Sequence, residues 1–209
     1  MKEISKIYLA IICLILFSCQ AKNPDRNKNR ILNDSTSKPE FAQKDSTSWI
    51  NDFRTFRTAI YEKNNKVLKS FFNFPIDNGN NEIWYLIYDG NESKLKTITG
   101  KDKSLTEAEF DKHFNKIFPQ EFVNSILKIK TDVLLKKHNY ETIMLKNEHK
   151  SYKTYASYDK QENILQLNFY SETPIDIGEG EMDKAEFSVV YYFDIKDGRL
   201  IFKKILLAG

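Results

Sequence analysis

The chain has 209 residues, of which 41% are hydrophobic and 29% are charged, and its formal net charge is +3. A charge so close to balance argues against a nucleic-acid-binding protein, because such proteins carry a strongly basic surface. The two cysteines, Cys13 and Cys19, both lie near the N-terminus, so the folded part is expected to lack disulfides and cysteine-based metal sites. The histidines His113, His138 and His149 are scattered singly, without metal-ligand spacing.

The N-terminal segment has the pattern of an export signal. Lys2 and Lys6 provide a basic start, and residues 7–17 form an uninterrupted apolar run. A permanent transmembrane helix needs about 20 apolar residues, so this run is too short for one. Its length and its basic start are typical of a secretory signal peptide.

The sequence Leu-Phe-Ser-Cys at residues 16–19 resembles the lipobox of bacterial lipoproteins, which is cut just before the cysteine. The resemblance implies that residues 1–18 are removed and that the Cys19 thiol receives a diacylglyceryl group. Each buried CH₂ contributes about 0.8 kcal/mol, so two or three acyl chains anchor a protein durably to a membrane. We therefore expect a lipoprotein of the cell envelope. The alternatives are an uncleaved membrane helix and a plain secretory signal with an unrelated cysteine.

The residue after the lipidated cysteine influences which membrane a lipoprotein reaches, and an Asp at that position tends to retain it at the inner membrane. This chain has Gln20 there, which favours the outer membrane, on its periplasmic or surface face.

Residues 19–47 are rich in Asn, Lys, Asp, Ser and Thr, and they contain Pro24 and Pro39. A segment with so few apolar residues cannot offset the entropy cost of ordering. We expect a flexible linker here, between the lipidated cysteine and a single globular domain formed by residues 48–209. That length is sufficient to bury a hydrophobic core.

Helical periodicity begins with the domain. Trp49, Phe53, Phe56 and Ile60 recur on one helical face, which predicts an amphipathic helix whose aromatic stripe is buried. A second short helix is predicted from residue 67 to residue 72. Three further helical features follow along the chain: a capping box formed by Ser104 and Glu107, a helix with Phe110, Phe114, Ile117 and Phe118 on one face, and a helix with Phe122, Val123, Ile126 and Leu127.

Between these helices, residues 82–89 read Glu-Ile-Trp-Tyr-Leu-Ile-Tyr-Asp, a composition that predicts a β-strand. A weaker strand is predicted at residues 94–99. Trp84, Tyr85 and Tyr88 are candidates for lining a ligand pocket, and ordinary packing within the strand is the alternative interpretation.

From Tyr140 onward the hydrophobic period changes from 3.6 to 2. Five strands are predicted, at residues 142–145, 152–158, 164–170, 186–194 and 200–207. Asp197-Gly198 predicts a tight hairpin before the last of them, because both residues accept positive φ. Helices followed by consecutive strands predict an α+β fold with an antiparallel meander.

The segment between the third and fourth predicted strands is acidic. Its carboxylates are Glu172, Asp176, Glu179, Glu181, Asp183 and Glu186. Calcium binding is one interpretation, because calcium takes several carboxylate oxygens, but the spacing of an EF-hand loop is absent. We therefore interpret the segment as a solvated acidic hairpin loop, without a metal.

This order of elements is similar to the nuclear transport factor 2-like superfamily. The segment 53–75, in which the helical stripe runs into Phe-Phe-Asn-Phe-Pro at residues 71–75, resembles the opening of lipoproteins from Bacteroidota-type bacteria. The resemblance implies a cone-like fold, in which a curved antiparallel sheet surrounds the N-terminal helix and leaves an apolar pocket. A cystatin-like fold is the close alternative. The superfamily includes ketosteroid isomerase and scytalone dehydratase beside many binding and assembly domains. No Asp and Tyr of this chain align with the isomerase pattern, so no catalytic residue is assigned.

Three functions remain open at this point. We favour a non-enzymatic envelope lipoprotein that binds a small apolar ligand or an envelope protein. The alternatives are a small isomerase-like or dehydratase-like enzyme and a structural subunit of an envelope assembly. The chain has no nucleophile elbow, Walker loop, HExxH motif or dinucleotide fingerprint, and no cofactor is expected.

Overall fold

The computed structural model describes residues 48–77, 81–98, 104–178 and 181–208. All of them belong to one compact unit, Ala42–Gly209, whereas the other unit, Met1–Phe41, lies wholly outside the described residues. The predicted signal peptide, the lipobox with Cys19 and the predicted linker therefore also lie outside them. No helix in the described ranges has the length and the hydropathy needed to cross a bilayer.

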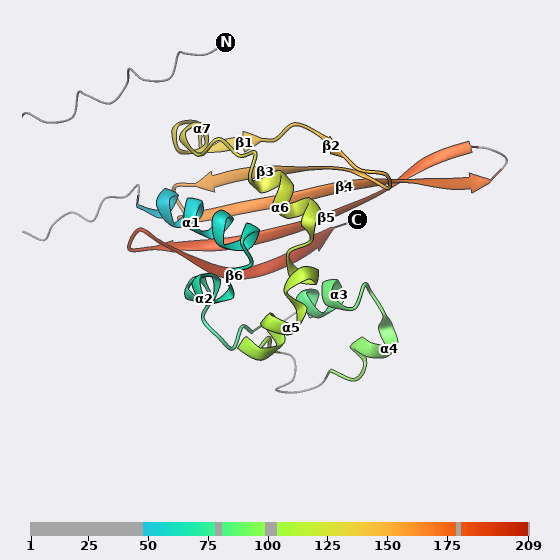
Figure 1. Ribbon diagram of the computed structural model, residues 1–209, viewed down its shortest axis with the longest axis horizontal. Coiled ribbons are helices and arrows are strands. Elements are labelled where there is room, and N and C mark those ends of the chain that lie inside the picture. Colours follow the sequence, from blue (N-terminus) through green and yellow to red (C-terminus); the bar gives the residue numbers. More distant parts are fainter. Residues whose placement is uncertain (1–47, 78–80, 99–103, 179–180, 209) are drawn as a thin grey trace, which may run out of the picture. The chain divides into compact units, whose positions relative to one another are not determined.

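The first half of the domain is helical and the second half is a sheet, as predicted for an α+β fold (Figure 1). The helices are α1 (Trp49–Tyr61), α2 (Asn65–Leu68), the 3₁₀ turn η1 (Lys69–Phe71), α3 (Glu82–Ile87), α4 (Glu92–Leu95), α5 (Glu107–Ile117), α6 (Gln120–Ile126) and α7 (Thr131–Lys137). The strands are β1 (Asn139–Glu141), β2 (Leu145–Lys146), β3 (Ser151–Asp159), β4 (Ile164–Gly178), β5 (Glu181–Lys196) and β6 (Arg199–Ala208).

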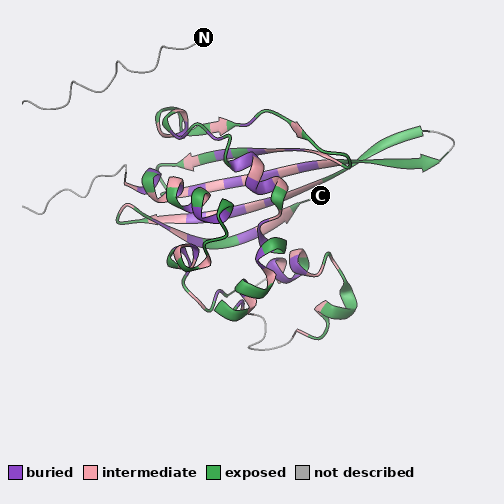
Figure 2. Ribbon diagram, viewed as in Figure 1, coloured by how far each residue is buried: buried purple, intermediate pink, exposed green. Residues whose placement is uncertain are grey.

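All strands pair antiparallel in the order β1-β3-β4-β5-β6, with β2 also on β3, and the sheet does not close into a barrel. Strand side chains alternate between a buried face and a partly exposed face (Figure 2). On β4, for example, Leu165, Leu167 and Phe169 are buried, whereas Gln166 and Asn168 between them are partly exposed. This alternation is what the period of 2 predicted.

Helix α1 packs its aromatic stripe into the core, which confirms the first helical prediction. Trp49, Phe53 and Phe56 are fully buried, and the ring of Phe56 lies edge-on to that of Phe193 on β5, with 4.9 Å between centroids. The Asp52 carboxylate of α1 also accepts hydrogen bonds from Arg199 Nε (2.7 Å) and from the Leu200 backbone N–H (3.0 Å). Helix α1 is thus joined to β5 by an apolar contact and to β6 by polar ones.

The free edge of the sheet at β6 is capped at both ends by side chains from helices. Asp52 caps the start of the strand through the bond to Leu200, and Glu82 Oε2 accepts from the Leu207 backbone N–H (2.9 Å) near its end. An edge strand with unpaired N–H groups is a template for pairing with another chain. These two carboxylates occupy such groups and protect that edge.

The predicted strand at residues 82–89 is wrong, because these residues form helix α3. Ile83, Trp84 and Ile87 are buried on one side of the helix, which packs against α5 and β6. Aromatic and β-branched residues favour strands only through the surface on which they pack, so the tertiary contacts of α3 outweighed the local preference for a strand.

The strand predicted at residues 94–99 is also wrong. Its described part begins in α4, which Asn91 caps by accepting from the Lys94 N–H (3.1 Å).

Two further local predictions need correction. The cap of α5 is Thr106, whose hydroxyl accepts from the Glu109 N–H at 3.2 Å, and not Ser104. Residues 142–145 form no continuous strand, because the chain leaves the sheet between β1 and β2. In a regular edge strand a backbone carbonyl would accept the hydrogen bond from the Thr154 N–H. Here the side-chain hydroxyl of Thr142 accepts it instead, at 3.0 Å. The turn at Asp197-Gly198 is confirmed, with φ of 51° and 72°.

Aromatic rings fill the interior between helices and sheet. Tyr191 of β5 is fully buried, and its ring stacks on that of Phe122, with 4.3 Å between centroids, and on that of Phe118 at 5.8 Å. Its hydroxyl donates to the Ile117 carbonyl at 2.6 Å, and burial raises the pKa of this phenol, so it stays neutral. A buried tyrosine needs such a partner for its hydroxyl.

We expect Tyr191→Phe to lower the free energy of unfolding by about 1–3 kcal/mol, because the substitution removes one partner of a buried hydrogen bond while it keeps the ring. Chemical denaturation measures this change. Tyr61→Phe is the control, since Tyr61 is 61% exposed, and it should change stability by less than about 0.5 kcal/mol. Equal effects of the two substitutions would contradict the assignment.

Candidate binding surface

Helix α3 carries the three aromatic residues that the sequence offered as pocket candidates. Trp84 is buried and stacks on Tyr88 with 5.9 Å between ring centroids, and both rings meet the His113 imidazole edge-on, at 6.2 and 6.0 Å. Tyr85 is 47% exposed and lies against Gly90, where a Cβ would come within 2.8 Å of the tyrosine hydroxyl. The structure therefore brings Trp84 and Tyr88 together in packing around a histidine and leaves Tyr85 apart from them.

His113 is the titratable group of this cluster. Its Nε2 lies 3.2 Å from Oε2 of Glu109, one turn earlier on α5, but the two atoms lack the alignment of a hydrogen bond. A general acid or base must reach a reacting group in a site that admits a substrate. Here the rings of Trp84 and Tyr88 cover the imidazole, which is the arrangement of a packed boundary histidine.

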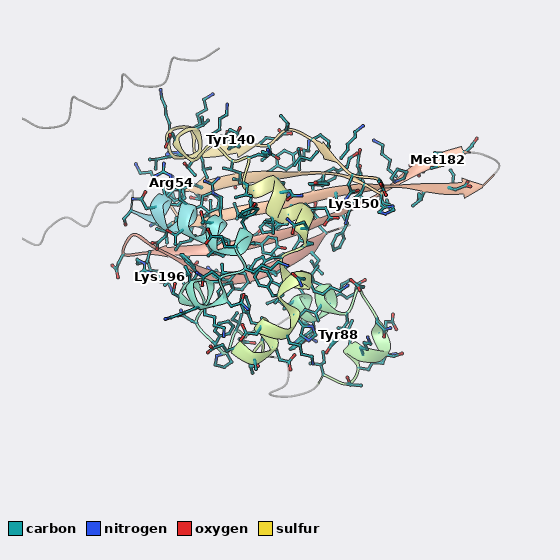
Figure 3. All side chains as sticks on the ribbon, in the orientation of Figure 1. Arg54, Tyr88, Tyr140, Lys150, Met182 and Lys196 are labelled. Atoms are coloured by element: carbon teal, nitrogen blue, oxygen red, sulfur yellow. The ribbon has the colours of Figure 1, made fainter. Side chains whose placement is uncertain are left out.

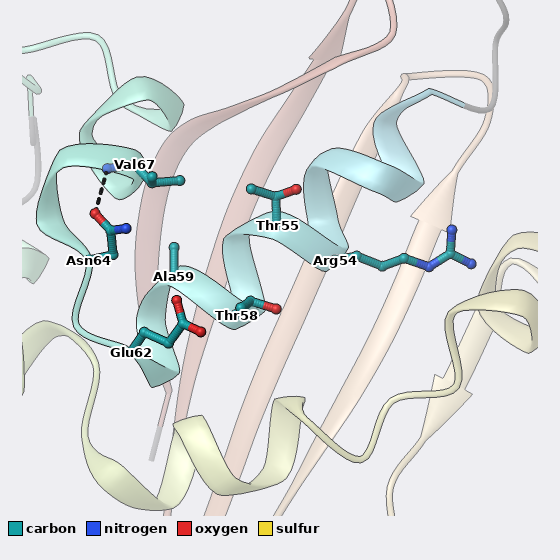
Figure 4. Close-up of a pocket in the computed structure, with 7 residues that line it drawn as sticks. All are labelled: Arg54, Thr55, Thr58, Ala59, Glu62, Asn64 and Val67. Carbon is teal, nitrogen blue, oxygen red and sulfur yellow. Dashed lines mark hydrogen bonds between the residues drawn. The ribbon is translucent and has the colours of Figure 1, made fainter. Parts of the chain in front are cut away.

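A shallow groove of about 300 Å³ lies on the outer side of α1, where the chain turns into α2 (Figure 4). It is lined by Arg54, Thr55, Thr58, Ala59, Glu62, Asn64 and Val67. The Arg54 guanidinium is already bonded to Thr131 Oγ1 (3.0 Å), Asn51 Oδ1 (2.8 Å) and Asp132 Oδ1 (2.6 Å). Asn64 accepts from the Val67 N–H and caps α2. The polar groups of the groove thus hold helices together, and Glu62 has no second titratable group opposite it for acid–base chemistry.

The sheet face turned away from the helices carries tyrosine and lysine side chains that satisfy one another. Lys153 Nζ lies 4.6 Å from the ring centroid of Tyr155 and 5.8 Å from that of Tyr170, and it bonds to Glu141 Oε1 at 2.8 Å. Lys204 lies over the ring of Tyr192 in the same way, at 5.1 Å. Cation–π contacts of this kind are ordinary on a solvated sheet. The ammonium groups cover the rings that an apolar ligand would need.

The acidic segment is an exposed hairpin, as expected, but β4 and β5 continue through it as a two-stranded ribbon and are not replaced by a loop. We call residues 172–186 the acidic ribbon. Its base is the pair Glu172–Glu186, and the strands stay paired as far as Gly178 and Glu181. Strand β3 begins opposite Glu172 and β6 ends opposite Ser188, so no third strand flanks the described part of the ribbon. It projects beyond the end of the sheet (Figure 1) and is exposed along its length (Figure 2).

Apolar side chains on the acidic ribbon face solvent. Ile175 is 39% exposed, Ile177 is 57% exposed and Met182 is 65% exposed. Figure 3 shows Met182 near the far end of the ribbon, beyond the body of the domain. Isolated two-stranded hairpins are at best marginally stable in water, and exposed strand edges invite pairing. Among the described residues this is the surface that best fits the binding of another macromolecule.

This surface was not identified from the sequence, because the segment was interpreted from its carboxylates and not from its apolar residues. A signal was present: Thr173, Ile175 and Ile177 alternate with other residues at the period of a strand. Within the described ranges, no three His, Asp or Glu side chains are grouped as ligands for a metal.

No protein-family model matches the chain, and no curated protein matches it in sequence.

Tyr170, at the base of the acidic ribbon, has a phenol whose pKa is raised above its ordinary value. Its hydroxyl donates to Glu172 Oε2 at 3.3 Å. Hydrogen bonding to Glu186 and, to a smaller extent, burial and the charge of Glu172 raise its pKa to about 12. The stabilising effect of the neutral phenol is present below the ordinary pKa of about 10 and is lost as the pH rises through about 12. We expect Tyr170→Phe to flatten the dependence of the unfolding midpoint on pH over that interval.

The direct measurement is the difference in tyrosinate absorbance between the wild type and Tyr170→Phe during an alkaline titration. We expect the difference to rise at about pH 12. A difference that rises at about pH 10, where an unperturbed tyrosine ionises, would contradict the bond to Glu186.

Proposed function

We propose that this chain is a lipid-anchored protein of the cell envelope whose folded domain binds a protein partner and catalyses no reaction. The observation that carries the binding part is the acidic ribbon, with apolar side chains exposed on strands whose outer edges are unpaired. A projecting ribbon can offer both its backbone and its side chains to a partner. The anchor rests on the lipobox-like sequence that ends at Cys19.

The arrangement of the interior also supports a binding domain over an enzyme. An isomerase-like or dehydratase-like mechanism requires a carboxylate or histidine directed into a closed apolar pocket with a perturbed pKa. The space that such a pocket would occupy here contains Phe118, Phe122 and Tyr191 in mutual contact. Outer-membrane residence, favoured by Gln20, is part of the same proposal.

The lipid anchor predicts that cells given a fatty-acid probe label the wild-type protein and fail to label Cys19→Ser. The reason is that the thiol of Cys19 is the proposed attachment point of the acyl chains. Ser18→Ala is the matched control, because it keeps a small residue before the cysteine and should keep the label. Undiminished label on Cys19→Ser would refute the anchor.

The binding proposal predicts a covalent adduct when a photo-cross-linking amino acid replaces Ile177 in the full-length protein in cells. Met182 is a second test position on the acidic ribbon. Tyr61 is the control position, because it is as exposed as these residues but lies at the end of α1. We expect adducts from the two ribbon positions and none from Tyr61. The absence of any adduct from the ribbon would overturn the binding function.

A further inference from the structure

We infer that the partner of the acidic ribbon is a second copy of this chain, and that two copies exchange their ribbons reciprocally. This inference rests on the proposed binding function and names its partner. Its starting point is the exposure of Ile175, Ile177 and Met182 on a ribbon without flanking strands. Ile175 and Ile177 lie on one strand and Met182 lies on the facing strand, opposite Asp176, so both strands of the ribbon expose apolar side chains, and exposed apolar surface is typical of docking sites.

The charge distribution identifies the second copy as the occupant. The acidic ribbon contains six carboxylates and one lysine, a formal charge of −5. The rest of residues 48–209 contains 23 basic and 18 acidic residues, a formal charge of +5. The ribbon is therefore complementary in charge to the body of its own domain, and opposite potentials steer two surfaces together.

The same charges determine which surfaces meet. Two acidic ribbons laid against each other would place like charges side by side, which costs several kcal/mol. The ribbon of one copy must therefore lie on the body of the other. A twofold arrangement makes this contact twice, so it doubles the area that one ribbon buries, and a larger buried area favours a stable interface.

The described part of the body includes a surface that combines a group of lysines with exposed apolar side chains, on a segment that also carries Asp132 and Glu141. We call it the basic edge, and it comprises Lys128, Lys130, Lys136, Lys137, Ile143 and Met144, all of which are exposed. These residues lie on the segment that leads through α7 and β1 along the outer side of β3 (Figure 1). None of the four lysines forms an ion pair with another described residue. Ile143 is 71% exposed and offers the apolar contact that Ile177 requires.

Charge reversal in full-length chains tests this arrangement, with the photo-cross-linker at residue 177. The ribbon variant is Glu181→Lys with Asp183→Lys, and the edge variant is Lys136→Glu with Lys137→Glu. We expect each variant alone to reduce the adduct of twice the chain mass by about tenfold or more, because the formal charge of the ribbon falls from −5 to −1 or that of the four lysines falls from +4 to 0, and the attraction is lost. Co-expression of the two variants should restore a mixed adduct, because the unchanged ribbon of the edge variant then meets the unchanged edge of the ribbon variant.

The matched control is Lys66→Glu with Lys112→Glu, which makes the same charge change on the exposed surfaces of α2 and α5. It should leave the adduct unchanged. An adduct of the wild type with a different protein would overturn the second copy while leaving the binding function intact. No adduct at all would overturn both. A doubled adduct that is insensitive to the edge variant, or equally sensitive to the control, would overturn the assigned contact.

Discussion

The contact between Phe56 of α1 and the core aromatic rings holds the domain together. Its ring lies edge-on to Phe193 at 4.9 Å, to Phe71 at 5.4 Å and to Phe118 at 5.9 Å. These partners come from β5, from the turn after α2 and from the residue that ends α5, so a single side chain joins three parts of the chain. Fully buried aromatic side chains contribute both buried area and preferred ring geometry. The domain of residues 48–209 contains no cysteine, since Cys13 and Cys19 both precede it, so no disulfide adds to the stability that this packing provides.

Much of the fold could be predicted from hydrophobic periodicity alone. The stripe of α1, the antiparallel meander and the turn at Asp197-Gly198 all follow from local patterns that tertiary packing reinforces. The prediction failed at α3, because Trp84 and its neighbours suit a strand and a helix equally and only the contacts with α5 and β6 decide between them. At residues 172–186 the hairpin was predicted, but the extent of its strands was not.

The candidate binding surface was harder to predict than the fold, for a physical reason. Whether Ile177 is exposed depends on where the neighbouring strands β3 and β6 end, which is a property of strand pairing. Trp84, Tyr85 and Tyr88 suggested a pocket because aromatic residues often bind ligands, but α3 directs the first into the core and leaves the second outside. In the interior between helices and sheet, the ring of Tyr191 stacks on those of Phe118 and Phe122.

Asp52 and Glu82, which are distant in sequence, occupy backbone donors at either end of β6. A donor that already holds a carboxylate cannot pair with a strand from another chain, so these two contacts oppose strand addition at both ends of β6. The projecting part of β4 and β5 has no such contacts with helices among the described residues, and its outer backbone groups stay available. The two carboxylates therefore act as a built-in guard against open-ended strand addition at the β6 edge.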